Sequence, residues 1–358
     1  MDLAIDDARL EFAGPRGYLD TASVGVPPAA TVAAMRRALE SWQRGEARPQ
    51  DYDPVVAAAR AAFARLVHVG EDDVAIGSQG SAMVGLVASS LPDRSRVLVV
   101  DGDFTSVLFP FLVHGGRGVE VVSVPLDRVA EAVDGGTTLV ACSAVQSATG
   151  ALADLDAIAA AARHHGAYTL IDITQACGWL PVEASRFDVT VCSAYKWLLA
   201  PRGTSFMTVG PAILDHITPH AAGWYAGADV WSSIYGGPLR LATTARRLDV
   251  SPAWLCWVGA VPALQLLGHV GVEAIHAHNV GLADRVRRHL GLPGGGSAIV
   301  RVESPGASAR LDAAGIRAST RAGAARLSFH LYNDELDADR AADVLSGGIV
   351  SGTAEGCR

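Results

Sequence analysis

Short apolar runs alternate with alanine-rich helical segments through the middle of this chain, and this alternation limits the fold more than any other feature. Five such runs, rich in β-branched residues, cover 96–103, 119–126, 137–145, 167–174 and 187–194. The segment ADLDAIAAAARHHG, which closes on Gly166, has the spacing of an amphipathic crossover helix. The order predicts an α/β fold with a mainly parallel sheet covered on both faces. Ligands of such sheets bind at the carboxyl ends of the strands.

The pattern changes after about residue 235. Helical segments at 252–268 and 272–290 lead to the flexible loop GLPGGGS, to the strand-like runs SAIVRVES and AARLSFHLY, and to a last helix near 336–346. This order predicts a smaller α+β domain. The expected units are an N-terminal segment at 1–20, a large domain at 21–235 and a small C-terminal domain at 236–358.

Bulk composition excludes several classes of protein. The chain has 358 residues, of which half are apolar and 18% are charged, and its net charge is -8. This charge argues against a nucleic-acid partner. The acidic N-terminus lacks the pattern of a secretion signal, and no stretch of about 18 residues stays apolar, so we expect a cytoplasmic protein without a membrane partner. The five cysteines form no CxxC pair, which predicts neither a disulfide framework nor a metal site.

Lys196 stands in SAYKWLLAPRG, between an apolar strand and a glycine-terminated turn. In one interpretation its ammonium group reaches solvent from the end of the strand. In the other, burial lowers its pKa, so that the neutral amine can form a Schiff base with a carbonyl cofactor. The motif alone favours the first interpretation.

Asp172 closes the preceding apolar run, YTLIDIT, as either a helix cap or a functional carboxylate. Adjacent parallel strands would bring Asp172 and Lys196 to one rim of the sheet. Such a pair suits pyridoxal phosphate, because the amine holds the aldehyde while the carboxylate keeps the pyridine nitrogen protonated. The strand, turn and helix of IGSQGSAMVGL, with the hydroxyl of Ser81, would bind the phosphate.

Six motifs resemble the class V aminotransferases, the group that contains cysteine desulfurases, kynureninase and isopenicillin N epimerase. They are YLDTASVGVPP, GSQGSA, SAVQSATG, LIDITQACGWLPVE, SAYKWLLAPRG and RLSFHLYN, in the family's order and rough spacing over nearly the whole chain. The resemblance implies the type I fold of PLP-dependent transferases, with a mainly parallel seven-stranded sheet in the large domain. It also implies pyridoxal 5'-phosphate as the cofactor and a homodimer with shared active sites.

The same resemblance assigns roles to individual residues. Lys196 corresponds to the Schiff-base lysine and the catalytic residue, Asp172 to the partner of the pyridinium, and Gln175 to the side chain near the ring hydroxyl. The other cofactor positions are Gly80, Ser81 and Ser193 at the phosphate, Tyr195 where relatives usually carry histidine, Phe104 stacked on the ring, Ser147 or Gln146 near the ring hydroxyl, and Ser251 reaching a neighbouring subunit's phosphate. A core position is the alternative for Phe104.

Substrate contacts are implied in the same way. Arg326 resembles the arginine that binds a substrate carboxylate with its paired donors, which implies an amino-acid substrate. An exposed strand arginine is the alternative. Ser23 belongs to the motif YLDTASVGVPP at the same site, and Trp224 and Tyr225 are expected at the substrate mouth, although their rings could equally pack at the domain junction.

The absence of one cysteine reduces the number of reactions that this chain could catalyse. Cysteine desulfurases carry a cysteine shortly before the carboxylate-binding arginine, whereas this chain has no cysteine between Cys256 and Cys357. We therefore expect a carbon-sulfur lyase that acts by β-elimination, similar to the ergothioneine-forming type. An aminotransferase is nearly as well supported, and an amino-acid epimerase is a further alternative. A catalytically degenerate binding protein is the alternative of another class, against which the retained Lys196 and Asp172 argue.

Overall fold

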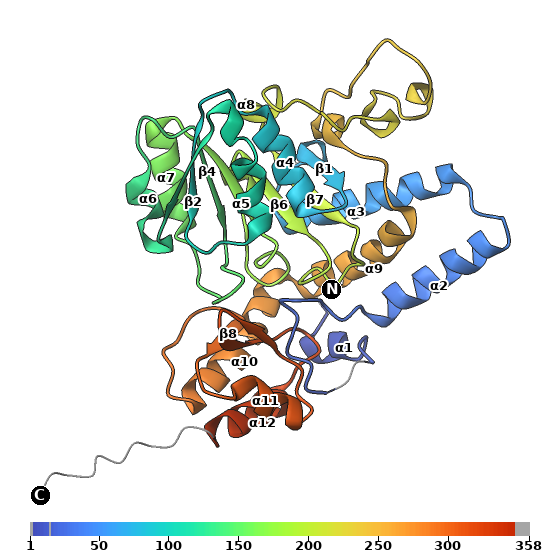
Figure 1. Cartoon of the computed structure of the whole chain (residues 1–358). Helices are drawn as coiled ribbons and strands as arrows, with labels where there is room; N and C mark the ends of the chain where they lie inside the picture. The colour runs from blue at the N-terminus through green and yellow to red at the C-terminus, as the bar shows by residue number, and fades with distance from the viewer. Residues whose placement is uncertain (1–2, 14–15, 348–358) are drawn as a thin grey trace, which may run out of the picture.

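A seven-stranded sheet forms the centre of the computed structural model, which describes residues 3–13 and 16–347 (Figure 1). Its strand order is β1-β7-β6-β5-β4-β2-β3, and every neighbouring pair is parallel except the two that β7 makes. The strands are β1 (Val74–Gly77), β2 (Arg96–Val100), β3 (Glu120–Val124), β4 (Leu139–Ser143), β5 (Tyr168–Asp172), β6 (Val189–Ser193) and β7 (Ser205–Val209). The predicted α/β fold with a mainly parallel seven-stranded sheet is confirmed.

Helices cover both faces of this sheet, because the side chains of its strands alternate between two apolar cores. In β2, Leu98 and Val100 belong to one core, whereas Val97 and Val99 belong to the other. The first core is closed by α3 (Asp53–Leu66), α6 (Val129–Ala132), α7 (Leu155–His165) and α9 (Trp254–Val270). The second is closed by α4 (Gly80–Ser90), α5 (Thr105–Leu112) and α8 (Pro211–Leu214).

The smaller α+β unit is built on a three-stranded antiparallel sheet of order β8-β10-β9. Its strands are β8 (Ile299–Val302), β9 (Ser319–Arg321) and β10 (Ala324–Ser328). The helices α10 (Val272–His289), α11 (Ala307–Ala313) and α12 (Glu335–Ser346) share its apolar core. This unit confirms the predicted small C-terminal α+β fold.

Two segments pack across the junction between the sheets. The helix α9 packs on α3 and on α2 (Ala29–Gln43), beside the large sheet. Near the N-terminus, Tyr18 forms an isolated bridge with Arg317, just before β9, and Asp20 forms one with Ser328 of β10. The helix α1 (Ile5–Arg9) contacts α9 and α10. The limits at residues 20/21 and 235/236 stay a prediction. The strands of the large sheet all come from residues 74–209 and those of the small sheet from residues 299–328, and the N-terminal segment adds isolated bridges at the small sheet.

Short 3₁₀ turns connect the main elements. They are η1 (Pro49–Tyr52), η2 (Glu71–Asp73), η3 (Gly115–Arg117), η4 (Leu126–Arg128), η5 (Ala184–Arg186), η6 (Trp224–Ala226), η7 (Trp231–Ser233) and η8 (Ala245–Leu248). Within residues 3–13 and 16–347, no single helix is long and apolar enough to cross a membrane. The pair α9 and α10 reaches the required length and composition only together, and the two helices bend by 84° at their junction.

A buried ion pair fixes the edge of the large sheet next to the start of α4. The guanidinium of Arg60 on α3 lies 2.6 Å from the carboxylate of Asp249, and both side chains are buried. The same carboxylate accepts the backbone N–H of Ile76 in β1 at 2.8 Å. Removing one partner would leave the other charge buried and uncompensated.

We predict that Asp249→Ala lowers the free energy of unfolding by about 3–5 kcal/mol, the usual effect of breaking a buried pair. Urea denaturation measures this change. Asp215→Ala is the matched control, because Asp215 pairs with Arg247 at 2.7 Å but its side chain is 88% exposed. Equal losses in the two variants would contradict the prediction.

Candidate functional site

Lys196 and Asp172 meet in one pocket at the carboxyl ends of two adjacent parallel strands. Asp172 is the last residue of β5 and pairs with Val191 of β6, and Lys196 follows β6 by three residues. Both residues line a cavity together with Ser78, Gln79, Gly80, Ser81, Phe104, Ser106, Ser143, Ser147, Thr174, Gln175, Ser193, Tyr195 and Arg202. The strand pairing thus produces the juxtaposition that the sequence predicts.

The Lys196 side chain is buried and does not extend to solvent. Its amine lies 5.1 Å from the centre of the Phe104 ring and 5.7 Å from that of Tyr195. Burial lowers the pKa of Lys196 to about 8, although the charge of Asp172 opposes this shift. The positive charges of Arg326 and Arg321 lower the pKa of the same amine further. The neutral form, which a nucleophile or base requires, is therefore far more populated at physiological pH than in an exposed lysine.

The environment of Asp172 favours a cation on its pocket side. Burial raises the pKa of Asp172, and hydrogen bonding by Thr174 and the charge of Lys196 oppose that shift. The backbone N–H of Thr174 donates to the carboxylate at 2.8 Å. The nearby Asp103 raises the pKa of Asp172 as well. A protonated ring nitrogen placed against Asp172 would stabilise the ionised carboxylate.

The start of α4 forms the opposite end of the pocket. The N–H of Gly80 donates to Ser193 Oγ at 3.2 Å, and a Cβ at residue 80 would lie 3.0 Å from that oxygen. Glycine thus keeps the space between this helix and β6 open. The N–H groups of the first turn, with Ser81, can bind an anion there. Arg202 also lines the pocket, with its guanidinium 5.3 Å from the centre of the Tyr195 ring.

Gln175 connects the pocket to the N-terminal segment. Its amide nitrogen donates to Ser147 Oγ at 3.1 Å and to the carbonyl of Ala22 at 3.0 Å. Ser147 lines the pocket, whereas the Gln146 side chain turns to the carbonyl of Ser143. Of the two candidates for a contact with the ring hydroxyl, the structure brings Ser147 into the pocket.

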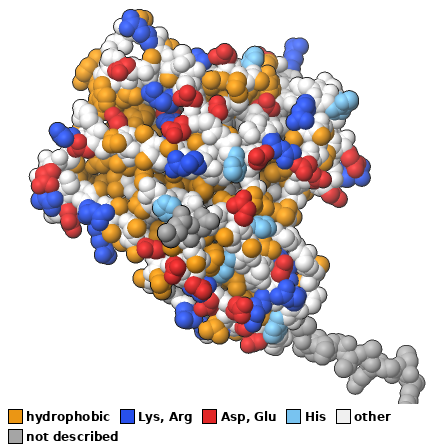
Figure 2. Space-filling view, turned by 180° about the vertical axis from the view of Figure 1, so that it is seen from behind, with side chains coloured by type: hydrophobic (Ala, Val, Ile, Leu, Met, Phe, Trp, Pro, Cys, Tyr) orange, Lys and Arg blue, Asp and Glu red, His pale blue; other side chains and the backbone are white. Residues whose placement is uncertain are grey.

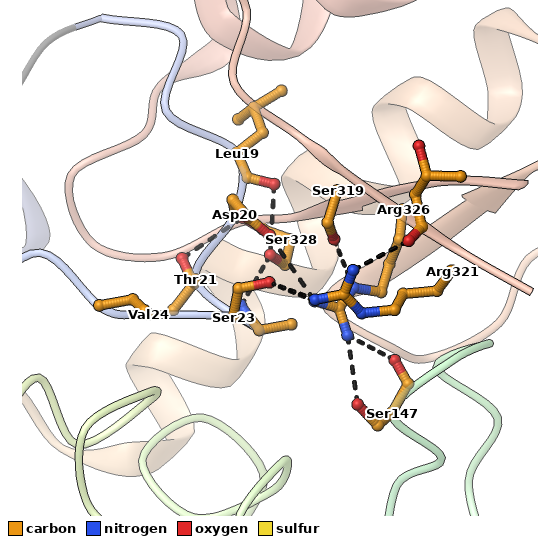
Figure 3. A network of polar contacts seen from close by, with 12 residues as sticks. Leu19, Asp20, Thr21, Ser23, Val24, Ser147, Ser319, Arg321, Arg326 and Ser328 are labelled. Atoms are coloured by element: carbon orange, nitrogen blue, oxygen red, sulfur yellow. Dashed lines mark hydrogen bonds and ion pairs between the residues drawn. The ribbon is translucent and has the colours of Figure 1, made fainter. Parts of the chain in front are cut away.

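Arg326 is the centre of a buried polar network (Figure 3). Its Nε donates to Ser319 Oγ at 3.0 Å, and its two terminal nitrogens donate to the Ser147 carbonyl at 2.6 Å and to Ser23 Oγ at 2.7 Å. Asp20 lies 3.6 Å away. Arg326, at 1% exposure, is therefore no exposed strand arginine: it ties β10 to the N-terminal loop and to the loop after β4.

Arg326 and Ser23 do not line the pocket but adjoin it through Ser147, whereas three other predicted site residues lie apart from it. The hydroxyl of Tyr225 donates to Asp53 at the start of α3, at 3.3 Å, and the Trp224 ring packs edge-on against Tyr225 at 5.3 Å. Ser251 is exposed. These three are not among the described residues that line the pocket of their own chain, so their roles toward substrate and phosphate stay predictions.

Sequence reasoning missed Asp103, Thr174 and Arg202. Asp103 accepts hydrogen bonds from the hydroxyl of Ser143 at 2.6 Å and from the N–H of Phe104 at 2.7 Å. It thereby fixes the backbone of Phe104, whose ring faces the Lys196 amine. The sequence does carry a signal for Asp103, because an acidic residue shortly after the apolar run of β2 is comparable with Asp172 at the end of β5. Thr174 Oγ1 accepts the N–H of Ser193 at 3.0 Å, a contact between two strand ends that spacing does not reveal.

The family model described as "Aminotransferase class-V" matches residues 17–300. The chain belongs to the class-V aminotransferase family. The predicted family, its pyridoxal 5'-phosphate cofactor and the prediction of a PLP-dependent enzyme are confirmed at this level. The pocket fits that cofactor, because it presents a buried amine, a carboxylate that favours a cation, and the N–H groups at the start of α4.

Individual relatives of this class-V protein differ in their named activities. It is 29% identical over 230 residues to an uncharacterised aminotransferase of Bacillus subtilis. That match covers 62% of this chain and 60% of the relative. It is also 29% identical over 258 residues to isopenicillin N epimerase of Streptomyces clavuligerus, covering 65% and 63% of the two chains. The similarity thus spans less than two thirds of these relatives.

A solved structure shows the same fold over almost the full chain. The complex of the cystine C-S lyase C-DES with its reaction product cysteine persulfide has a TM-score of 0.85 and 20% sequence identity. It covers 93% of this class-V chain and 98% of the lyase chain. At this identity the likeness establishes the fold.

We predict that Lys196 of the cofactor-free protein reacts with pyridoxal 5'-phosphate at a rate that rises with pH to a midpoint near 8. Burial lowers the folded-state pKa below its ordinary value, so the neutral amine becomes available at lower pH than for an exposed lysine. Absorbance after rapid mixing measures the rate. A midpoint near the ordinary lysine pKa of about 10.4 would contradict the burial of this amine.

Proposed function

We propose that this protein cleaves the carbon-sulfur bond of an amino acid by pyridoxal-phosphate-dependent β-elimination. The observation that carries the proposal is the absence of a pocket thiol within the described residues. Cys142, Cys177 and Cys192 are buried and do not line the pocket. Cys256 does not line it either, and its thiol donates to the carbonyl of Arg202 at 3.3 Å. Burial raises the pKa of Cys142, Cys192 and Cys256, which keeps these thiols protonated.

The hairpin before Arg326 supports the same proposal. The strands β9 and β10 are joined by Ala322 and Gly323 alone, and the hairpin presents serine, threonine and arginine where desulfurases carry a thiol. A sulfur atom released from substrate would therefore find no protein thiol to accept it in this hairpin. It would leave with the departing fragment of the substrate.

Arg326 and Arg321 provide the proposed site for the substrate carboxylate. Both guanidinium groups donate to Ser23 Oγ, at 2.7 and 3.1 Å (Figure 3). Burial and the charge of Arg321 lower the pKa of Arg326 to about 10, so the Arg326 guanidinium stays charged at neutral pH. Two cations that share one neutral oxygen favour an anion in its place, and a carboxylate can accept from both. The Ser23 hydroxyl would move aside when substrate binds.

Each remaining step falls to a group in the pocket. The bound cofactor supplies an electron sink for the pair left when the α-proton is removed. Lys196 would hold the cofactor and, once replaced by the substrate's amine, would accept the α-proton. The electron pair of the carbon-sulfur bond would leave with sulfur. Asp172 would keep the ring nitrogen protonated, and the ring of Phe104 would cover the cofactor.

We further propose a homodimer with shared active sites. The segment of residues 228–240, which follows Trp224 and Tyr225, projects past the β1 side of the large sheet (Figure 1), and its Tyr235 is 91% exposed, so this segment could reach a second subunit. Apolar side chains gather on the same side of the molecule (Figure 2). Trp42, 63% exposed on α2, borders a groove of about 510 Å³ with Tyr52 and Trp254. Such a patch is typical of an interaction surface.

The enzymatic proposal predicts a yellow protein whose absorption band disappears with borohydride and is absent from Lys196→Ala. Incubation with L-cystine and cysteine S-conjugates should yield pyruvate and a sulfur product in the wild type alone. Pyruvate and thiol assays measure these products. Accumulation of pyridoxamine phosphate would instead identify an aminotransferase, and racemisation of the amino acid without pyruvate would identify an epimerase.

The dimer proposal predicts that Trp42→Asp halves the molecular mass in solution, because a charge in an apolar interface opposes association. Sedimentation equilibrium measures the mass. Leu336→Asp is the matched control, since Leu336 is 65% exposed on α12 of the small unit. A wild-type monomer, or a Trp42→Asp variant with the wild-type mass, would contradict this interface.

A further inference from the structure

His330 is a fully buried histidine, just after β10, that contacts the segment carrying Lys196. Its Nδ1 accepts the backbone N–H of Leu331 at 2.7 Å. Its Nε2 lies 2.9 Å from the carbonyl oxygen of Trp197. Because Nδ1 is the acceptor, the ring proton lies on Nε2, which donates to this carbonyl. The small unit thus holds the residue that directly follows Lys196.

Packing leaves this histidine little freedom. Its ring stacks on Trp197 at 5.7 Å and 30°, and on Tyr332 at 5.7 Å and 27°. Burial lowers the pKa of His330 to about 4, so the ring stays neutral at physiological pH. A protonated ring would direct a second N–H at the N–H of Leu331. One tautomer and one hydrogen-bond direction therefore persist.

The two successive peptides that follow Lys196 and Trp197 are each confined by a glycine. A Cβ at Gly25 would lie 2.0 Å from the Lys196 carbonyl oxygen, and one at Gly178 would lie 2.6 Å from that of Trp197. Gly178 has a φ of +103°, which a side chain would strain further. The backbone that carries Lys196 is therefore enclosed by the large unit, while His330 supplies its hydrogen bond from the small one.

Trp197 also contacts Gln175, the residue that is predicted to lie near the hydroxyl group of the cofactor ring. The indole N–H of Trp197 donates to Gln175 Oε1 at 2.7 Å. Since Oε1 is the acceptor, the amide nitrogen of Gln175 faces Ser147 Oγ, at 3.1 Å. The orientation of Trp197 thus fixes which end of the Gln175 amide faces the pocket.

We propose that His330 is a positioning residue, whose Nε2–H holds the carbonyl of Trp197 and thereby fixes both Lys196 and Gln175 from the small unit. His330 does not line the pocket among the described residues, so it acts through Trp197. The proposal rests on Lys196 as the attachment point of the cofactor, which belongs to the proposed function. It does not depend on the reaction that follows.

Two amide variants separate the donor from the ring. In His330→Gln the amide nitrogen can replace Nε2 and keep the bond to Trp197. In His330→Asn the shorter side chain can serve only the Nδ1 side, so the carbonyl of Trp197 loses its donor. His276→Asn is the matched control, because His276 also stacks on a tryptophan, Trp179, at 5.8 Å and 2°, and its Nδ1 has no hydrogen-bond partner among the described residues.

Amide hydrogen exchange over residues 193–200 of the cofactor-free protein is the first measurement. We expect about tenfold faster exchange in His330→Asn, the order of effect of one lost buried hydrogen bond, and wild-type rates in the other two variants. The second measurement is the rate at which Lys196 captures pyridoxal 5'-phosphate, which should fall about tenfold in His330→Asn only. Thermal unfolding of each variant shows how much of any change is a general loss of stability.

Equal exchange in His330→Asn and His276→Asn, or equal losses in His330→Asn and His330→Gln, would overturn the proposal. If His330→Asn does not fold, His330→Gln decides: wild-type exchange and capture support the role of the donor, and tenfold changes refute it. A wild-type protein that captures no cofactor at Lys196 would refute the proposed function instead. The exchange comparison would then still test the contact between His330 and Trp197.

Discussion

Burial of the Lys196 amine beside Asp172, at the ends of two neighbouring parallel strands, is the constraint on which the site depends. Removing an ammonium group from water disfavours its charge, whereas a nearby carboxylate favours it. Here burial has the larger effect, and the pKa of the amine falls to about 8. The pair needs the register of β5 and β6, and that register needs a sheet covered on both faces.

The small unit contributes two buried side chains beside this site, Arg326 on β10 and His330 just after that strand. Arg326 joins the loops of Ser23 and Ser147, and His330 holds the carbonyl of Trp197. A buried arginine of this kind is stable only when its donors are satisfied, and three serines satisfy them here. Under the proposed function, substrate binding at Arg326 and attachment of the cofactor at Lys196 would both depend on how β10 packs against the large unit.

Sequence periodicity predicted most strands correctly because each was a short apolar run between turn residues. The strand β7 is not evident from the sequence, since it follows directly on the turn that closes the Lys196 motif. The strand β9 has only three residues and no apolar pattern. For the site, the strand-end residues Asp172 and Lys196 could be predicted together, because parallel pairing brings strand ends to one rim. Asp103 has the same kind of position, shortly after the apolar run of β2.

The sequence by itself determined the alternation of strands and helices, the family motifs and the absence of a thiol before Arg326. These are local patterns, and local spacing is what a sequence displays. Only the tertiary structure decided that Lys196 is buried, that Ser147 and not Gln146 enters the pocket, and that Trp224, Tyr225 and Ser251 lie elsewhere in the same chain. It also brought Ser23, Ser147 and Arg326 together from three segments. Burial and long-range hydrogen bonds depend on which distant segments pack together, and no spacing along one chain specifies that.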